Sequence, residues 1–211
     1  MHQHCVFQLL NNWETSVKDT AYHNYTDYLQ WTDNNYELID GEAYFMAPAP
    51  NLEHQEVVGD IYFQLRLALA GKKCRAFIAP IDVRLAQGQD DADELVDTVI
   101  QPDVLVVCDE NKLDRRGVRG APDWVLEVLS PATASHDQIK KRDLYERHGV
   151  REYWLVHPTD RVLTIYLLEG KEFSKPRIVE LSGETALTVL DDVLIQWDDL
   201  LTRLPLAEDL Y

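Results

Sequence analysis

The alternation of apolar residues identifies one strand that is buried on both of its faces. In the segment WVLEVL (124–129), both sets of alternating positions are apolar except for Glu127, which is typical of a strand inside a sheet. A buried, ionised carboxylate costs on the order of several kcal/mol unless a cation or several donors compensate it. We therefore expect a positive group beside Glu127. The alternative is an edge strand with Glu127 facing water.

Similar patterns predict the other elements of an α/β fold. A helix follows the central strand after Ser130-Pro131 and ends at His148-Gly149, with Thr133 or Ser135 as its cap. The remaining predictions are a short helix within 17–31, a hairpin over 36–46 around Asp40-Gly41, a helix from the N-cap Asn51 to Gly71, strands within 73–85, 98–108, 151–158 and 161–170, and a strand plus a short helix between 178 and 204.

The helix after the central strand has an aligned polar face, formed at positions i, i+4 and i+8 by Asp137, Lys141 and Tyr145. An isolated Asp and Lys pair of this spacing is usually a surface salt bridge worth ~0.5 kcal/mol or less. The position of this pair directly after Glu127 favours a functional role instead. Lys140 lies about 100° around the helix and is excluded from that face.

The other polar features are either candidates for chemistry or ordinary surface groups. His54 lies on the apolar stripe of its helix and is either a core residue or a group facing a cleft. Asp103 follows Pro102 at the head of a strand, as a turn acceptor or a metal ligand. Glu37 is by default an exposed strand carboxylate, with a supporting site role as the alternative. The acidic loop 87–97 lacks EF-hand spacing and is interpreted as a solvated loop, and His2 and His4 as terminal residues without a ligand role.

Composition limits the number of domains and the partners. The 211 residues, 45% of them hydrophobic, suffice for one domain over 25–205 with an N-terminal extension over 1–24. The formal net charge of −17 disfavours non-specific attraction to nucleic acids or anionic membranes. The segment 112–151 is nevertheless +3 and the remainder −20. Its basic residues form either solvated faces or a patch that attracts phosphate.

The cysteines and the N-terminus predict the compartment. Cys5, Cys74 and Cys108 are odd in number and include no C-x-x-C pair, so neither a disulfide framework nor a zinc ribbon is expected. The first residues lack a positive region and a cleavage site, and no run of ~18 apolar residues occurs. We expect a cytoplasmic, non-exported protein.

Several motifs together resemble a known bacterial family. They are Pro102-Asp103, EVLSPAT (127–133), the D-x-x-x-K-x-x-x-Y pattern from Asp137 to Tyr145, and GVREYW (149–154). YELIDGE, PAPNLEHQ, APIDVRL and APDWVLEVLSP agree in the same order. The chain thereby resembles the Uma-type family of putative restriction endonucleases, a branch of the PD-(D/E)XK nuclease superfamily, over roughly 28–170.

The resemblance implies a fold and a catalytic site. The fold is a restriction-endonuclease-like central mixed sheet flanked by helices, with an N-terminal hairpin. Asp103 and Glu127 on adjacent strands would bind Mg²⁺, which Mn²⁺ can replace, and the metal would activate water for in-line attack on a phosphodiester. The superfamily lysine two residues after the glutamate is replaced here by Leu129, and Lys141 matches the displaced lysine of related members, where it orients the water.

The same resemblance adds His54 and Asp82 as supporting residues, beside Glu37, Asp137 and Tyr145 from the patterns described above. At His157 family members commonly have Asp. The predicted function is a Mg²⁺-dependent DNA endonuclease, in which a homodimer would suit the cutting of two strands. The alternatives are a catalytically inactive nuclease-fold binding protein and a metal-dependent phosphohydrolase of RNA or nucleotides.

Overall fold

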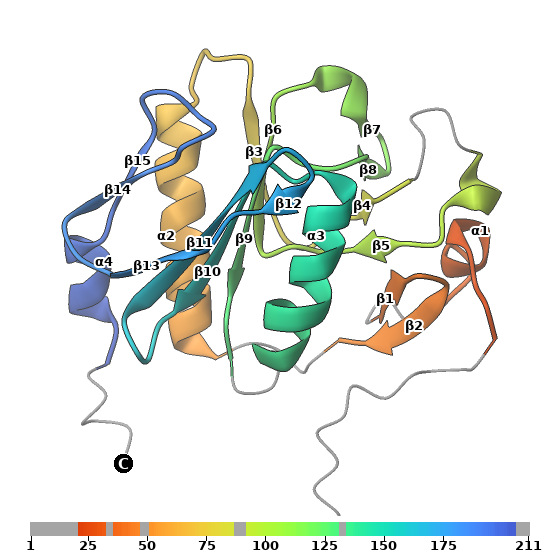
Figure 1. Ribbon diagram of the computed structural model, residues 1–211, viewed down its shortest axis with the longest axis horizontal. Helices are drawn as coiled ribbons and strands as arrows, with labels where there is room; N and C mark the ends of the chain where they lie inside the picture. The colour runs from red at the N-terminus through yellow and green to blue at the C-terminus, as the bar shows by residue number, and fades with distance from the viewer. Residues whose placement is uncertain (1–20, 33–35, 47–50, 87–91, 131–133, 206–211) are drawn as a thin grey trace, which may run out of the picture.

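The computed structural model (Figure 1) describes residues 21–32, 36–46, 51–86, 92–130 and 134–205, and the strands in these ranges form two large sheets and one separate two-stranded pair. The larger sheet has seven strands in the order β12-β11-β10-β9-β6-β3, with β13 paired to β11, and the smaller has six in the order β2-β1-β5-β4-β8-β7. The strands of the larger sheet are β3 (Arg75–Ile78), β6 (Val104–Val107), β9 (Trp124–Val128), β10 (Glu152–His157), β11 (Val162–Glu169), β12 (Glu172–Phe173) and β13 (Arg177–Glu180). Those of the smaller sheet are β1 (Tyr36–Ile39), β2 (Glu42–Phe45), β4 (Val83–Arg84), β5 (Val99–Ile100), β7 (Leu113–Asp114) and β8 (Gly117–Arg119). A separate pair is formed by β14 (Glu184–Ala186) and β15 (Leu194–Gln196).

The helices and helical turns connect and cover these sheets. They are α1 (Tyr25–Tyr28), α2 (Leu52–Ala68), η1 (Asp93–Leu95), η2 (Glu110–Lys112), η3 (His136–Lys141), α3 (Arg142–His148) and α4 (Asp198–Arg203). Within the described ranges, no helix combines the length and the apolar character that crossing a membrane requires.

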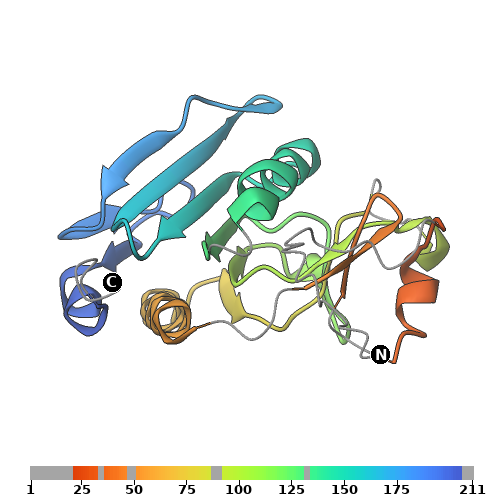
Figure 2. The same ribbon diagram turned by 90° about the horizontal axis from the view of Figure 1, so that it is seen from below.

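Strand β9 lies inside the larger sheet, parallel to β10 and antiparallel to β6. All five of its residues are buried, and the exposed fraction of Glu127 is 2%. The predicted burial of this strand is therefore confirmed, and the alternative of an edge strand with Glu127 in water is wrong. On one face Leu126 packs in a core with the apolar residues of α2, and on the other Val125 packs with Leu144 of α3. Figure 2 shows the two helices on opposite sides of the sheet, which confirms the expected mixed sheet with helices on both faces.

Helix α2 and the hairpin β1–β2 follow their local sequence signals. The side chain of Asn51 accepts from the His54 backbone N–H, which caps the helix as predicted. The hairpin turns at Asp40 and Gly41, with φ angles of 51° and 80°, the left-handed conformation that a two-residue turn of this kind requires. Both elements lie where the apolar pattern placed them.

The two strand runs predicted over 73–85 and 98–108 each form two short strands. The first run leaves the larger sheet after β3 and enters the smaller sheet at β4, and the second passes from β5 back to β6. The segments between β3 and β4 and between β5 and β6 each contain a proline, Pro80 or Pro102, which has no N–H to donate to a neighbouring strand. The passages lie side by side, because the Ala79 N–H donates to the Asp103 carbonyl oxygen at 3.0 Å. Asp82 and Asp103 therefore lie where the chain crosses between the sheets.

The expectation that the cysteines form no disulfide is wrong for Cys74 and Cys108, which are bonded to each other. Strands β3 and β6 are antiparallel with Arg75 opposite Val107, so the residues just outside this pair lie opposite each other. This proximity depends on the register of two strands that are far apart in the chain, and cysteine spacing does not reveal it. The predicted elements of the C-terminal part, two strands over 151–170 and a later strand and helix, are confirmed by β10, β11, β13 and α4.

Candidate active site

The predicted metal-ligand pair, Asp103 and Glu127, lies at neighbouring points of the larger sheet. Glu127 belongs to β9, and Asp103 directly precedes β6, which pairs with β9. The Asp103 side chain accepts from the Val128 N–H at 2.8 Å, and the Asp103 N–H points to Glu127 Oε2 at 3.4 Å. Each carboxylate is thus fixed by the backbone of the other strand. The expectation that two acidic residues converge from adjacent strands is confirmed for this geometry.

Lys141 provides the positive group expected beside Glu127. Its Nζ atom lies 3.0 Å from Glu127 Oε1, 3.1 Å from Glu37 Oε1 and 3.6 Å from Asp137 Oδ1. Tyr145 donates its hydroxyl to the same Glu127 oxygen at 2.7 Å. Lys141 and Tyr145 are both buried. The polar face predicted for this helix therefore points into the protein, toward the strand carboxylate.

The segment that carries Lys141 is wound more widely than the α-helix predicted from the sequence. Residues His136–Lys141 form a π-helical segment that continues as α3 (Figure 1). A π-helix aligns residues five apart, which brings His136 and Lys141 to one side. Both contact Glu37, at 3.2 Å and 3.1 Å. The side chain of Ser135 makes no capping bond, Thr133 lies outside the described residues, and Gly149 ends α3 with φ 83° as predicted.

Glu37 is buried, so the expectation of an exposed strand carboxylate is wrong. Its exposed fraction is 4%, and its Oε1 accepts from the Gln101 N–H at 2.9 Å. Lys141 and His136 complete its surroundings. These partners are 64 to 104 residues away in the chain. No local pattern in the strand could therefore reveal them, and the roles of Gln101 and His136 were not predicted.

The electrostatics of this group follow from four carboxylates around one amine. Burial raises the pKa of Glu127, and the neighbouring Asp103, Asp137 and Glu37 raise it further, well above its usual range, although Lys141 opposes them. Burial would also raise the pKa of Glu37, but Lys141 and His136 outweigh it and lower that pKa to about 2. Burial lowers the pKa of Lys141, but the carboxylates, Glu127 foremost, raise it well above its usual value. Lys141 is therefore held as a cation, and the group retains an excess of negative charge.

A cavity of about 1100 Å³ opens beside these residues and is lined by Asp103, His54 and Asp82. His54 Nε2 lies 3.1 Å from Asp103 Oδ2, so His54 faces the cleft, which decides between its two predicted settings. Asp82 accepts from the Tyr28 hydroxyl at 3.1 Å and the Gln101 side-chain amide at 2.9 Å. The Asp103 side chain is 19% exposed. The Asp103 side chain is therefore accessible from the cavity, whereas Glu127 and Lys141 are buried and are not among the residues that line the cavity.

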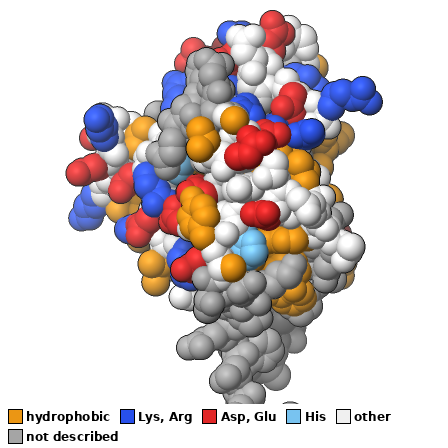
Figure 3. Space-filling model, turned by 90° about the vertical axis from the view of Figure 1, so that its right-hand side faces the viewer, with side chains coloured by type: hydrophobic (Ala, Val, Ile, Leu, Met, Phe, Trp, Pro, Cys, Tyr) orange, Lys and Arg blue, Asp and Glu red, His pale blue; other side chains and the backbone are white. Residues whose placement is uncertain are grey.

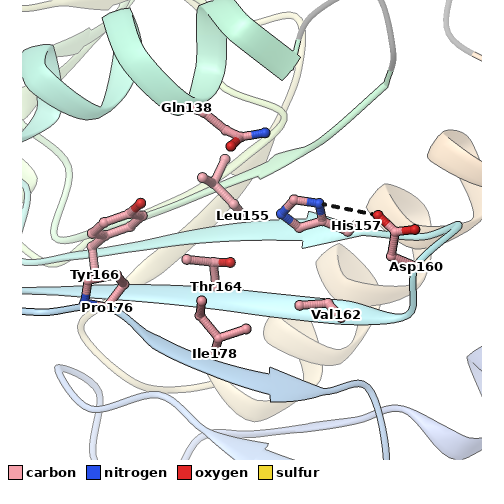
Figure 4. Close-up of a pocket in the computed structure, with 9 residues that line it drawn as sticks. All are labelled: Gln138, Leu155, His157, Asp160, Val162, Thr164, Tyr166, Pro176 and Ile178. Carbon is pink, nitrogen blue, oxygen red and sulfur yellow. Dashed lines mark ion pairs between the residues drawn. The ribbon is translucent and has the colours of Figure 1, made fainter.

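A second cavity, of about 330 Å³, lies over β10, β11 and β13 (Figure 4). Leu155 and Thr164 are paired across β10 and β11 in its floor, and Gln138 of η3 lies above them in Figure 4. His157, where the resemblance leads one to expect Asp, lies at its edge with Nδ1 4.0 Å from Asp160. None of the residues lining this cavity belongs to the carboxylate group around Lys141.

Most basic residues of the segment 112–151 are engaged within the protein. The bonded pairs are Arg116 and Arg119 with Asp93, Arg142 with Asp143, Arg147 with Asp40, and Arg151 with Asp123. Lys140 lies with its Nζ 4.0 Å from the centre of the Tyr44 ring, away from Glu127 as predicted. Figure 3 shows acidic, basic and apolar side chains interspersed on the side of the molecule that carries α1 and β1–β2. The visible side chains on this side therefore do not form a broad basic surface.

Comparison with known proteins places the chain in a family. A family model described as Uma2, "Putative restriction endonuclease", matches residues 25–202. The chain belongs to the Uma2 family. This result confirms the resemblance that the motifs indicated.

Two further likenesses agree with membership of the Uma2 family. A Synechocystis protein named "Uncharacterized protein slr1290" is 27% identical over 146 residues, which are 66% of this chain and 71% of that protein. A crystal structure of a "putative nuclease belonging to DUF820" from Anabaena variabilis superposes with a TM-score of 0.66 at 17% identity. The superposition covers 85% of this chain and 97% of the other. At this identity the likeness establishes the fold.

Proposed function

We propose that this Uma2-family protein is a Mg²⁺-dependent endonuclease that hydrolyses DNA phosphodiester bonds. The observation that carries the proposal is the convergence of Asp103, Glu127 and Lys141. Two carboxylates from adjacent strands meet, and the lysine lies 3.0 Å from the more deeply buried one. Phosphoryl transfer requires carboxylates that bind a metal ion and a positioned cation that stabilises the developing charge, and this group of residues can supply both.

The donor set fits Mg²⁺. Within the described residues, no three His, Cys, Asp or Glu side chains form a group that could hold a metal ion by themselves. Mg²⁺ commonly uses one or two carboxylates and completes its shell with water and substrate phosphate. Asp103 Oδ2 and Glu127 Oε1 are engaged by protein donors. Asp103 Oδ1 and Glu127 Oε2 accept no bond shorter than 3.4 Å from the described residues, which leaves one hard oxygen on each side chain for the metal.

When bound, the metal would polarise a phosphoryl oxygen and lower the pKa of a coordinated water. Lys141 would stabilise the negative charge that develops on the phosphate, and its three carboxylate partners hold the amine protonated and in place. His54 fixes one oxygen of Asp103, and Tyr145 fixes one oxygen of Glu127. These contacts limit the rotation of both metal ligands, which is the contribution that supporting residues make to such sites.

Cleavage of plasmid and of single-stranded circular DNA in Mg²⁺, with Asp103→Asn as the main variant, tests the proposal. We expect cleavage by the unaltered protein and a loss of about 100-fold or more in the variant. Lys140→Met is the matched control, because Lys140 points to the Tyr44 ring and not to the site. Mg²⁺ should also raise the melting temperature of the unaltered protein and not that of Asp103→Asn. Cleavage that persists in Asp103→Asn would refute the assignment of this site.

The same protein and the same variant distinguish two alternative functions. Nucleic-acid binding without cleavage and without a metal-induced rise in melting temperature would support the non-catalytic binding protein. Hydrolysis of RNA or nucleotides in place of plasmid, again lost in Asp103→Asn, would support the other phosphohydrolase.

A further inference from the structure

The larger cavity is also lined by residues outside the catalytic group, which have no role in the proposed hydrolysis. Asp103 and His54 line one part, and the hairpin tip Arg115-Arg116 and the rings of Tyr28 and Trp31 line others. Positive groups, flat rings and a catalytic carboxylate thus share one cavity.

The hairpin β7–β8 presents the two arginines in a fixed position. Asp114 pairs with Gly117 across the turn, and the Val118 N–H donates to the Asp82 carbonyl oxygen at 2.8 Å. Gly117 has φ 119°, and a Cβ there would lie 2.3 Å from that same oxygen, so the hairpin packs directly on the cavity wall. Because Asp82 belongs to the wall, this backbone hydrogen bond ties the hairpin to the cavity.

The two arginines at the tip differ in their partners. Arg116 Nη1 bonds Asp93 at 2.6 Å, whereas Arg115 is exposed and has no ion-pair partner among the described residues. The neighbouring Asp114 is already paired with the buried Arg84 at 2.6 Å. The guanidinium of Arg115 is therefore the group at this end that is available to an anion, and a guanidinium is well shaped to bind phosphate.

The aromatic wall is also held in place by bonds behind it. The Tyr28 hydroxyl donates to Asp82 at 3.1 Å, and the Trp31 ring lies 5.2 Å from the Tyr28 ring and 5.7 Å from the Tyr36 ring. Fixed rings next to a positive group are the features with which proteins bind single-stranded nucleic acid, because unpaired bases can stack on them. The bases of a duplex remain paired and stacked on each other, and extruding one costs on the order of a few kcal/mol.

We propose that this cavity binds an unpaired DNA strand, with a backbone phosphate on Arg115, bases against Tyr28 and Trp31, and the scissile phosphate at Asp103. The inference rests on the proposed nuclease function and specifies its substrate as a single strand or an unpaired end. The mixed charges on the side that carries α1 and β1–β2 (Figure 3) agree with it, because a duplex backbone favours a broad basic surface.

Binding measured without metal tests the inference independently of hydrolysis. Fluorescence anisotropy in EDTA would compare a labelled single-stranded oligonucleotide with the same sequence as a blunt duplex. We expect the single strand to bind about tenfold more tightly or better. Arg115→Gln should weaken it several-fold and reduce the slope of log K against log salt by about 0.7, the value for one phosphate contact on a single strand. Trp31→Leu should weaken it about fivefold or more.

Two control variants make the result specific. Arg66→Gln removes the same charge from the exposed surface of α2 and should leave the affinity within twofold. Gln138→Ala alters the smaller cavity of Figure 4 and should also have no effect. Equal or tighter duplex binding, or a loss with Gln138→Ala but none with Arg115→Gln, would overturn the inference.

The two proposals fail in distinguishable ways. Cleavage of duplex plasmid that is lost in Asp103→Asn but unchanged in Arg115→Gln would sustain the nuclease and overturn the single-strand inference. Arg115-dependent binding of the single strand without cleavage of any DNA would overturn hydrolysis and sustain the binding cavity. Absence of both binding and cleavage would overturn both.

Discussion

Replacing Lys141 by methionine isolates the charge that holds the candidate site together. The change keeps an unbranched side chain of similar length, so the loss of packing is small. It leaves Glu37, Glu127 and Asp137, whose oxygens lie 3.0 to 3.6 Å from the amine in the unaltered protein, without their shared cation.

The magnitude follows from these distances and from burial. At an effective dielectric constant of about 20, one contact of 4 Å is worth about 4 kcal/mol, and desolvation of the buried groups opposes most of the sum. Removing one partner of a buried ion pair costs about 3–5 kcal/mol. Because Lys141 serves three carboxylates, we expect a loss near 5 kcal/mol in the free energy of unfolding at pH 7. With an m value of about 3 kcal/mol per M urea, the midpoint falls by roughly 1.7 M.

Urea unfolding of Lys141→Met beside Lys140→Met measures this loss. The Lys140 amine lies over the face of the Tyr44 ring, a contact worth about 0.5–1 kcal/mol. The pH dependence adds an independent criterion. Without the amine, the buried carboxylates have a raised folded-state pKa, so they stabilise the variant at low pH and that stability is lost as the pH rises. Equal midpoints for the two variants, or a deficit for Lys141→Met that does not grow between pH 5 and pH 8, would refute the reasoning.

Three further predictions concern other groups. The pKa of Glu37 is lowered to about 2 in the folded protein, so the ionised carboxylate stabilises the fold at pH values above the unfolded pKa near 4.5, and this stabilisation is lost as the pH falls toward 2. Glu37→Gln should therefore reduce the pH dependence of urea unfolding between these values by on the order of 3 kcal/mol. Identical curves for the variant and the unaltered protein would contradict this prediction. Gly117→Ala places a Cβ 2.3 Å from a backbone oxygen, whereas the Cβ of Gly71→Ala, also at positive φ, meets nothing within 4 Å. We expect Gly117→Ala to lower the melting temperature by several degrees more than Gly71→Ala. Equal melting temperatures would show that the hairpin shifts to accommodate the added methyl group. Cys108→Ser removes a disulfide that closes 34 residues, which should cost about 3–4 kcal/mol in the free energy of unfolding under oxidising conditions; a reductant should lower the stability of the unaltered protein alone.

Local patterns predicted the parts of the fold whose interactions are local. Asn51 and the stripe of α2, Asp40-Gly41 in the hairpin, and the doubly buried strand β9 are each specified within a few residues. Glu127 could be interpreted as buried because its neighbours on both faces are apolar, and burial of a carboxylate requires a cation. That argument predicted a positive group beside Glu127, and the structure places Lys141 there.

The errors concern residues whose environment is made by distant segments. Glu37 has polar and apolar neighbours like any half-exposed strand, and its burial depends on Gln101, His136 and Lys141. The Cys74–Cys108 bond depends on the register between β3 and β6. The passage of two strand runs between the sheets at Pro80 and Pro102 was likewise visible only as proline positions.

The wide winding of His136–Lys141 makes the site sensitive to a change in chain length alone. Deleting one residue between His136 and Lys141 would allow the segment to close into ordinary α-helical turns. If the deleted residue is Gln138 or Ile139, every acidic and basic group survives, yet the imidazole and the amine could no longer reach Glu37 together. A family member with such a deletion would keep each of these side chains and lose their arrangement around Glu37, so the spacing between the histidine and the lysine is as informative as the lysine itself.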